Sequence, residues 1–297
     1  MPEFHKVSLE DKQWIKERLA KEERLSCEFT FGNMFSYCAK ICIHVADYEG
    51  FLITRCKIDN YISYCCPLGS GDMKKAIDFI VEDAKQNGEN RTFIIYGISP
   101  KYAKIIEEVA SDKIDLFLER DAFDYVYLSS DLINLTGKKF QPKRNHISYF
   151  KKNYDWQYEK ITQDNIPECL SMSEKWLEQS QSESKADLEK ELKIIKLVFD
   201  NYEALDYVGG LIRVDGQVIA YTMGEKMNDD MFCVHIEKAF YEYRGAYPMI
   251  NQQFVTNELS NYMYINREDD VGLENLRKAK NSYNPVFMLE KYEATLK

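Results

Sequence analysis

The two halves of this chain predict the same order of secondary-structure elements. Each half reads as a helix, three antiparallel strands, and then a helix, a strand, a helix and a strand. Residue identity between the halves is negligible, so the duplication rests on element order alone. A chain of 297 residues is about twice the usual domain length. We therefore expect an α/β (α+β) protein of two tandem domains, each with a mixed, mostly antiparallel sheet flanked by helices.

The expected bounds of the helices and strands come from hydrophobic periodicity, capping residues and turn residues. In the first half, helices are expected at 8–24, 72–86 and 100–110, an irregular aromatic stretch at 27–35, and strands at 37–46, 51–57, 61–66, 92–96 and 116–128. Asp59 and Asn60 form a predicted turn. In the second half, helices are expected at 164–177, 185–201, 246–260 and 272–282, and strands at 207–214, 217–224, 231–239, 262–266 and 286–292. The domains would span 1–136 and 156–297, with a connecting helix at 137–155.

Composition excludes several classes of protein. The net charge of −10 disfavours a general binder of nucleic acid or anionic membranes, which usually needs an excess of Lys and Arg. No apolar leader and no stretch of about 18 apolar residues is present, so we expect a cytoplasmic protein without an integral membrane segment. The eight cysteines include no CxxC pair and suit reduced thiols. The four histidines are widely separated in sequence, so we expect no metal.

The strand expected at 231–239 carries the candidate acid and base groups. With an alternation of two, Cys233, His235 and Glu237 would share one face. An ordinary His titrates near 6.5 and an ordinary Glu near 4.3, so His235 is the better matched base and Glu237 the second candidate. Interior His and Glu residues are also common as purely structural groups.

The residues that follow this strand suggest an anion site. Arg244, Gly245 and Ala246 can turn the chain into a helix whose first amides are unpaired and carry partial positive charge. Arg267, at the end of a later strand, could pair with Glu237 or hold a phosphate or carboxylate. Asp270 is a good N-cap, and Lys238 is expected to face away from His235 and Glu237.

The connecting helix is strongly basic in an acidic protein. Residues 137–154 contain six Lys or Arg and no acid, and they include Lys143, Arg144 and Lys151. A charge run is usually a solvated surface, but only a concentrated patch could attract a polyanion to this protein. Arg277 and Lys280 form a second basic cluster, which would extend the first into a groove for a tRNA acceptor stem if the two lie close together.

Five segments together resemble a known family. They are Lys143-Arg-Asn-His-Ile, His235-Ile-Glu-Lys-Ala, Tyr243-Arg-Gly-Ala-Tyr, Tyr264-Ile-Asn-Arg-Glu-Asp-Asp-Val-Gly-Leu and Leu276-Arg-Lys-Ala-Lys-Asn-Ser-Tyr-Asn-Pro. They look like the C-terminal domain family of phosphatidylglycerol lysyltransferases, and Fem-type peptidoglycan aminoacyltransferases are similar in plan. The resemblance implies two tandem domains of the GNAT acyltransferase fold. In the membrane-bound relatives it implies transfer of an aminoacyl group from charged tRNA to a lipid hydroxyl.

The leading hypothesis is therefore an acyltransferase. Its preferred form transfers an aminoacyl group from charged tRNA to a small or peptide-like acceptor. It would bind no cofactor tightly, and aminoacyl-tRNA or acyl-CoA would be the donor. One alternative is an acyl-CoA N-acyltransferase, although Glu242 and Tyr247 depart from the usual pyrophosphate loop of that fold. Another is a non-catalytic module that binds RNA or an anion. Sequence leaves the acceptor and the oligomeric state open.

Overall fold

The chain forms two compact units in a computed structural model that describes residues 3–20, 26–58, 60–89, 91–179 and 185–297. One unit comprises residues 1–124, 269–272 and 289–297, and the other comprises residues 125–268 and 273–288. We call them the N-terminal and C-terminal units. The predicted end of the first helix at Arg24 and the predicted turn residue Asp59 lie outside the described residues.

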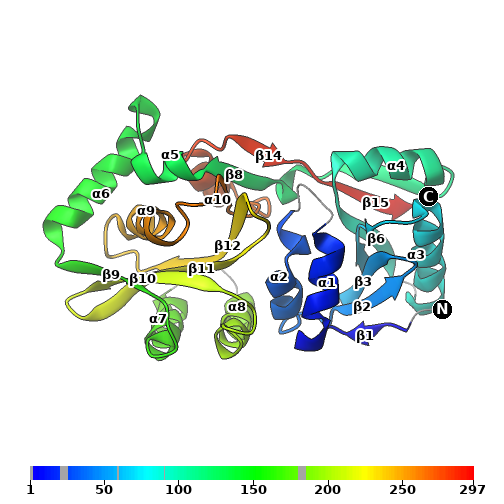
Figure 1. The fold of residues 1–297 in the computed structure, drawn as a ribbon, viewed down its shortest axis with the longest axis horizontal. Helices are drawn as coiled ribbons and strands as arrows, with labels where there is room; N and C mark the ends of the chain where they lie inside the picture. The colour runs from blue at the N-terminus through cyan, green and yellow to red at the C-terminus, as the bar shows by residue number, and fades with distance from the viewer. Residues whose placement is uncertain (1–2, 21–25, 59, 90, 180–184) are drawn as a thin grey trace. The chain divides into compact units, whose positions relative to one another are not determined.

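The N-terminal unit is built on one mixed sheet (Figure 1). Its pairs are antiparallel except for the parallel pair of β4 with β6. In spatial order the strands are β1 (His5–Lys6), β2 (His44–Tyr48), β3 (Phe51–Ile58), β4 (Tyr61–Cys65), β6 (Thr92–Ile98), β15 (Tyr292–Leu296) and β7 (Ile114–Leu118), and β5 (Leu68–Gly69) pairs with β3. Its helices are α1 (Lys12–Leu19), α2 (Phe31–Tyr37), α3 (Met73–Asn87) and α4 (Pro100–Ala110).

Local signals explain where these helices begin. The Asp72 side chain accepts hydrogen bonds from the amides of the first turn of α3, and the Ser99 side chain caps α4, whose first residue is Pro100. Residues 27–35 were expected to be irregular, but Thr30 caps α2 by accepting from the Asn33 amide. The strand prediction at 37–46 is therefore wrong over most of its length, because the chain is helical to Tyr37 and β2 begins only at His44.

The C-terminal unit has a second mixed sheet with helices on both faces (Figure 1). Its strands in spatial order are β14 (Phe287–Leu289), β8 (Asp124–Leu128), β13 (Tyr264–Asn266), β12 (Met231–Ala239), β11 (Gln217–Lys226), β10 (Val208–Val214) and β9 (Trp156–Lys160). Helix α9 (Ala246–Glu258) covers one face, and α7 (Ile166–Gln179) and α8 (Lys185–Asp200) cover the other. The remaining helices are α5 (Ser129–Asn134), α6 (Gln141–Asn153) and α10 (Glu274–Asn281). Strand β9 was not predicted.

Two segments expected to be single strands each divide between the two sheets. The prediction at 116–128 covers β7 and β8, which the turn at Arg120–Ala122 separates. The prediction at 286–292 covers β14 and the start of β15. As a result β8 belongs to the second sheet and β15 to the first, so the compact units are not the contiguous segments 1–136 and 156–297. The fold class itself, two mixed and mostly antiparallel sheets flanked by helices, is confirmed.

Candidate active site

The candidate site lies where two parallel strands separate. Strand β13 pairs with β12 only from Met231 to Cys233, and β13 ends at Asn266. Strand β12 continues to Ala239, and among the described residues no strand pairs with this later part on the β13 side. After Asn266 the chain stays with β8, since the Arg267 amide donates to the Tyr125 carbonyl. A gap between two buried strands is therefore bordered by the second half of β12.

A β-bulge changes the direction of the side chains in that half. The register with β11 pairs Gly224 with Val234 and Met223 with Ile236, so His235 is passed over. The prediction that Cys233, His235 and Glu237 share one face is therefore wrong, because the bulge resets the alternation after His235. Glu237 accepts from Asn251 of α9, on one face of the sheet.

Lys238 lies on the face of the sheet opposite Glu237, as consecutive residues of a strand do. Its ammonium binds Glu191 of α8 and lies over the ring of Trp176 in α7. The prediction that Lys238 faces away from both His235 and Glu237 is therefore confirmed for Glu237 and wrong for His235, because the bulge puts those two residues on opposite faces.

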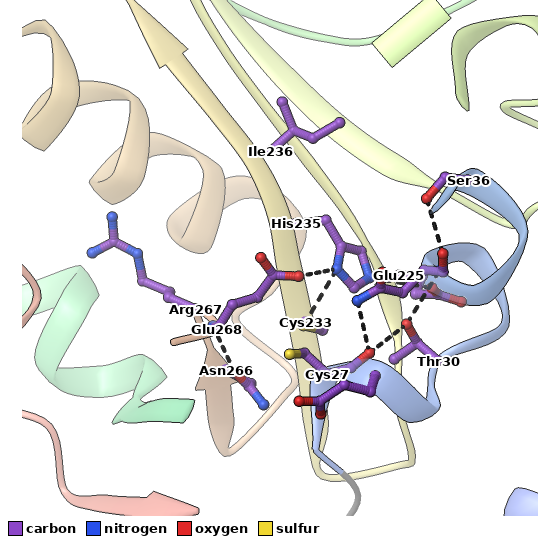
Figure 2. A network of polar contacts seen from close by, with 12 residues as sticks. Cys27, Thr30, Ser36, Glu225, Cys233, His235, Ile236, Asn266, Arg267 and Glu268 are labelled. Atoms are coloured by element: carbon purple, nitrogen blue, oxygen red, sulfur yellow. Dashed lines mark hydrogen bonds and ion pairs between the residues drawn. The ribbon is translucent and has the colours of Figure 1, made fainter. Parts of the chain in front are cut away.

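His235 is held between two carboxylates (Figure 2). Its Nδ1 lies 2.7 Å from Oε1 of Glu268, and its Nε2 lies 3.2 Å from Oε1 of Glu225. Burial alone would lower the pKa of His235, but the neighbouring Cys233 and Tyr207 and the hydrogen bond to Glu225 outweigh it and raise the pKa well above the ordinary value. The raised pKa favours the imidazolium over the neutral ring. The predicted role of His235 as a base stays a prediction.

Glu237 forms a second buried ion pair across the same gap. Its Oε1 accepts from Nη2 of Arg267 at 2.8 Å, so the predicted pairing of these two residues is confirmed. The guanidinium also lies over the rings of Tyr283 and Tyr127. In Figure 2 the Arg267 side chain points away from the neighbouring Glu268. Two adjacent residues after β13 thus reach Glu237 and His235 separately.

Among the described residues, two groups of side chains have metal-ligating atoms within 4.8 Å of one another. The first is Cys233, His235 and Glu268. The 2.7 Å separation of the His235 and Glu268 atoms is a hydrogen-bond distance, shorter than the roughly 3.3 Å between two nitrogen or oxygen ligands of one tetrahedral zinc. This group is therefore arranged as a hydrogen-bonded cluster.

The second group, in the N-terminal unit, is Cys27, Asp124 and Asp269. The Lys291 ammonium already lies 2.6 Å from Asp124 Oδ1 and 3.7 Å from Cys27 Sγ, so a cationic group is present in it. The expectation that the protein holds no metal stays a prediction.

The Arg244–Ala246 turn has a packing role. Gly245 adopts φ +94°, and a Cβ there would lie 2.5 Å from the carbonyl oxygen of His146 in α6. Glycine is therefore required for α9 to begin against α6. Arg244 stacks over Tyr149, 4.5 Å from its ring centroid. Anion binding by Arg244, Gly245 and Ala246 stays a prediction.

The three basic candidates of α6 have different surroundings. Arg144 donates to the Leu135 and Gly137 carbonyls and to Gln141, which ties the helix to the preceding turn. Lys151 is exposed and lies 5.8 Å from the Trp156 ring centroid. Lys143 is partly buried and lies over the Tyr283 ring. Only Lys143 of the three is brought to a ring that Arg267 also contacts.

The two residues of the second basic cluster, Arg277 and Lys280, also have different surroundings. Lys280 donates to the Arg267 carbonyl at 2.6 Å and so fixes the residue that binds Glu237, whereas Arg277 is partly exposed in α10. Asp270 is fully buried and accepts from the Gly272 amide, one residue before Leu273, which is the N-cap of α10. Its predicted role as that N-cap is therefore wrong.

Sequence reasoning missed Glu268, Glu225, Asn251 and Tyr283. Glu268 follows Arg267 directly, and Glu225 is the acid that β11 pairs with Cys233, so the hairpin register was the available signal for it. Nothing in the local sequence distinguishes Asn251 or Tyr283, which reach the site through helix packing. Within the described part of the chain, no helix is both long and apolar enough to cross a membrane.

The family described as phosphatidylglycerol lysyltransferase, C-terminal, matches residues 19–295. A solved protein of unknown function from Bacteroides thetaiotaomicron is 36% identical, with a TM-score of 0.91 and full coverage of both chains. An uncharacterised protein of Mycoplasmoides gallisepticum is 25% identical over 194 residues, which is 62% of this chain. That match spans 60% of the length of the curated relative.

Two more distant structures show the fold. The C-terminal domain of an Agrobacterium fabrum protein described as a putative lysylphosphatidylglycerol synthetase is 15% identical, with a TM-score of 0.68 over 97% of this chain and 92% of that one. A tandem GNAT protein from the clavulanic acid biosynthesis pathway is 10% identical, with a TM-score of 0.56 over 100% and 98% of the two chains. The fold is thus a tandem GNAT fold, and the chain belongs to the phosphatidylglycerol lysyltransferase C-terminal family.

Proposed function

We propose that this protein is an aminoacyltransferase that moves an aminoacyl group from charged tRNA to a small or peptide-like acceptor. The family supports acyl transfer in general, since its description names a lysyltransferase. The observation that carries the proposal is the chain of proton-holding groups at the gap between β12 and β13, formed by Glu225, His235 and Glu268. Acyl transfer needs a group that gives a proton and a group that takes one at the same place.

Glu268 and His235 can supply the two proton transfers that acyl transfer from an aminoacyl ester requires. The acceptor amine or hydroxyl attacks the ester carbonyl and loses its proton to Glu268, whose side chain is 25% exposed. The His235 imidazolium gives its Nδ1 proton to the ribose oxygen that leaves, while its Nε2–H stays bound to Glu225. His235 then recovers a proton from Glu268 across their 2.7 Å contact. One C–O bond breaks, one bond to the acceptor forms, and the acceptor's proton ends on the tRNA.

In this scheme Glu225 is a positioning residue. It is almost fully buried and binds Nε2, so it fixes the ring orientation and favours the charged form. Glu237, the second predicted catalytic group, faces α9 and fixes Arg267 instead. We assign it to positioning as well.

The test is discharge of a mixed pool of aminoacyl-tRNAs by the purified full chain, with cell metabolites added as acceptors. His235→Gln removes the charge, and His44→Gln, in β2 of the N-terminal unit, is the matched control. We expect loss of one amino acid's ester with the wild type and with His44→Gln, and a rate at least 100-fold lower with His235→Gln.

Parallel assays separate the alternatives. Release of free thiol from acyl-CoA without any tRNA discharge would replace the proposal with an acyl-CoA N-acyltransferase. Binding of tRNA without discharge, unchanged in His235→Gln, would replace it with a non-catalytic module.

A further inference from the structure

A buried cation of the C-terminal unit has one donor group without an acceptor. Arg267 meets Glu237 through Nη2 alone, and its Nη1 is buried with no hydrogen-bond partner among the described residues. Only 12% of the Arg267 side-chain surface is exposed. The Tyr283 side chain also hydrogen-bonds to the guanidinium, but Nη1 itself meets no acceptor within hydrogen-bond distance among the described residues. The rings of Tyr283 and Tyr127 contact the guanidinium, and a ring face is a weak acceptor for an N–H group. A buried donor left unpaired is costly, so it indicates a missing acceptor.

A second cation lies beside the same ring without a carboxylate. The Lys143 ammonium is 3.8 Å from the centroid of Tyr283, and no carboxylate of the described chain lies within ion-pair distance of it. Burial, and next the charge of Arg267, lower the pKa of Lys143 to about 8. In the part of the chain that the structure describes, Glu237 is thus the one carboxylate that offsets the charges of both Arg267 and Lys143.

We infer that Arg267 Nη1 and Lys143 Nζ together bind one carboxylate of the acceptor, so that the acceptor is an amino acid, a short peptide or another carboxylic acid. This inference rests on the proposed function, because it names the acceptor class of the same gap. The carboxylate would supply the acceptor that Nη1 lacks and the negative charge that Lys143 lacks.

Charge and shape favour a carboxylate over a phosphate. Two cations and Glu237 sum to one positive charge, which one carboxylate neutralises and a phosphate dianion would exceed. The free edge of a guanidinium matches a planar carboxylate. A phosphodiester also has a single charge. In a nucleic acid, however, each phosphodiester has neighbouring phosphates on the same strand. These would have to approach a buried guanidinium that Tyr283 and Tyr127 contact.

The test is isothermal titration of the full chain, without tRNA, with N-acetylglycine as the probe. N-Acetylglycinamide is the uncharged control, and dimethyl phosphate and inorganic phosphate are the phosphate arms. Lys143→Met removes one cation, and Lys152→Met removes an exposed lysine of the same helix. Arg267→Lys is the second variant, because it keeps a positive charge for Glu237 while removing the guanidinium edge.

We expect saturable binding of N-acetylglycine and none of the amide. We also expect at least 10-fold weaker binding in Lys143→Met and in Arg267→Lys, and less than a twofold change in Lys152→Met. At pH 8 the binding should take up protons, measured as a heat that depends on the buffer, and this uptake should vanish in Lys143→Met.

Equal binding of the amide, or no binding of any probe, would overturn the inference. Binding of dimethyl phosphate alone would assign the site to a phosphodiester instead. Because no tRNA is present, these outcomes are independent of the discharge assay, so carboxylate binding and aminoacyl transfer can fail separately.

Discussion

Glu237 and Arg267 are joined by a 2.8 Å ion pair across the gap between β12 and β13. The side chains of both residues are almost buried, at 13% and 12% exposure. No main-chain hydrogen bond of the β12–β13 ladder extends beyond Asn266, so this pair and the neighbouring contact of His235 with Glu268 connect the strands where the ladder stops.

Glu237→Gln should destabilise the protein by about 3 kcal/mol, because it leaves the buried Arg267 without a counter-charge. The measurement is equilibrium unfolding in urea, followed by circular dichroism. Glu274→Gln is the matched control, since Glu274 is in an exposed ion pair with Lys278 and should cost less than about 0.5 kcal/mol. A loss at Glu237 no larger than at Glu274 would mean that Arg267 has another partner.

The raised pKa of His235 makes stability depend on pH. A group whose pKa is higher in the folded than in the unfolded protein contributes fully below its unfolded pKa, near 6.5, and that contribution is lost as pH rises through the folded pKa. The melting temperature should therefore decrease above pH 6.5, and the decrease should be smaller in His235→Gln. Melting curves at pH 6 to 9 measure it, and parallel curves for both proteins would refute the assignment of a charged His235.

Lys143 should make stability depend on pH in the opposite direction to His235. Its folded pKa of about 8 lies below the unfolded value near 10.4, so the unfolded chain holds more protons between these values and stability rises with pH. Lys143→Met should be more stable than the wild type at pH 7, and its melting temperature should lack this rise between pH 8 and 10. Lys152→Met should behave as the wild type does. A less stable Lys143→Met would show that the ammonium is favourable where it lies.

Gly245→Ala should destabilise the protein by about 2 kcal/mol, because the methyl group would meet the His146 carbonyl in addition to the strain of φ +94°. Gly216→Ala separates the two effects. Gly216 has φ +80° but open space around its would-be Cβ, so only the strain of about 1 kcal/mol remains. Equal losses in urea unfolding would mean that α6 moves aside to accommodate the methyl group.

Sequence patterns predicted the elements that local signals determine. The bounds of β12 and α4 agree with the structure to the residue, because turn and capping residues flank both segments. The bulge at His235 could not be predicted, because it depends on the register with β11 rather than on the composition of β12. His235 was found as a titratable residue within a predicted strand and Arg267 as one at the end of another, but their partners Glu268 and Tyr283 depend on tertiary packing.

The place of β15 constrains how the protein can be made. This strand lies between β6 and β7, yet the ribosome reaches Tyr292 long after it has passed Leu118. During synthesis the first sheet therefore has unpaired edges on β6 and β7, and such edges can pair with other chains. The N-terminal unit therefore cannot complete its sheet until residues 292–296 have emerged, even though its first residues are made first.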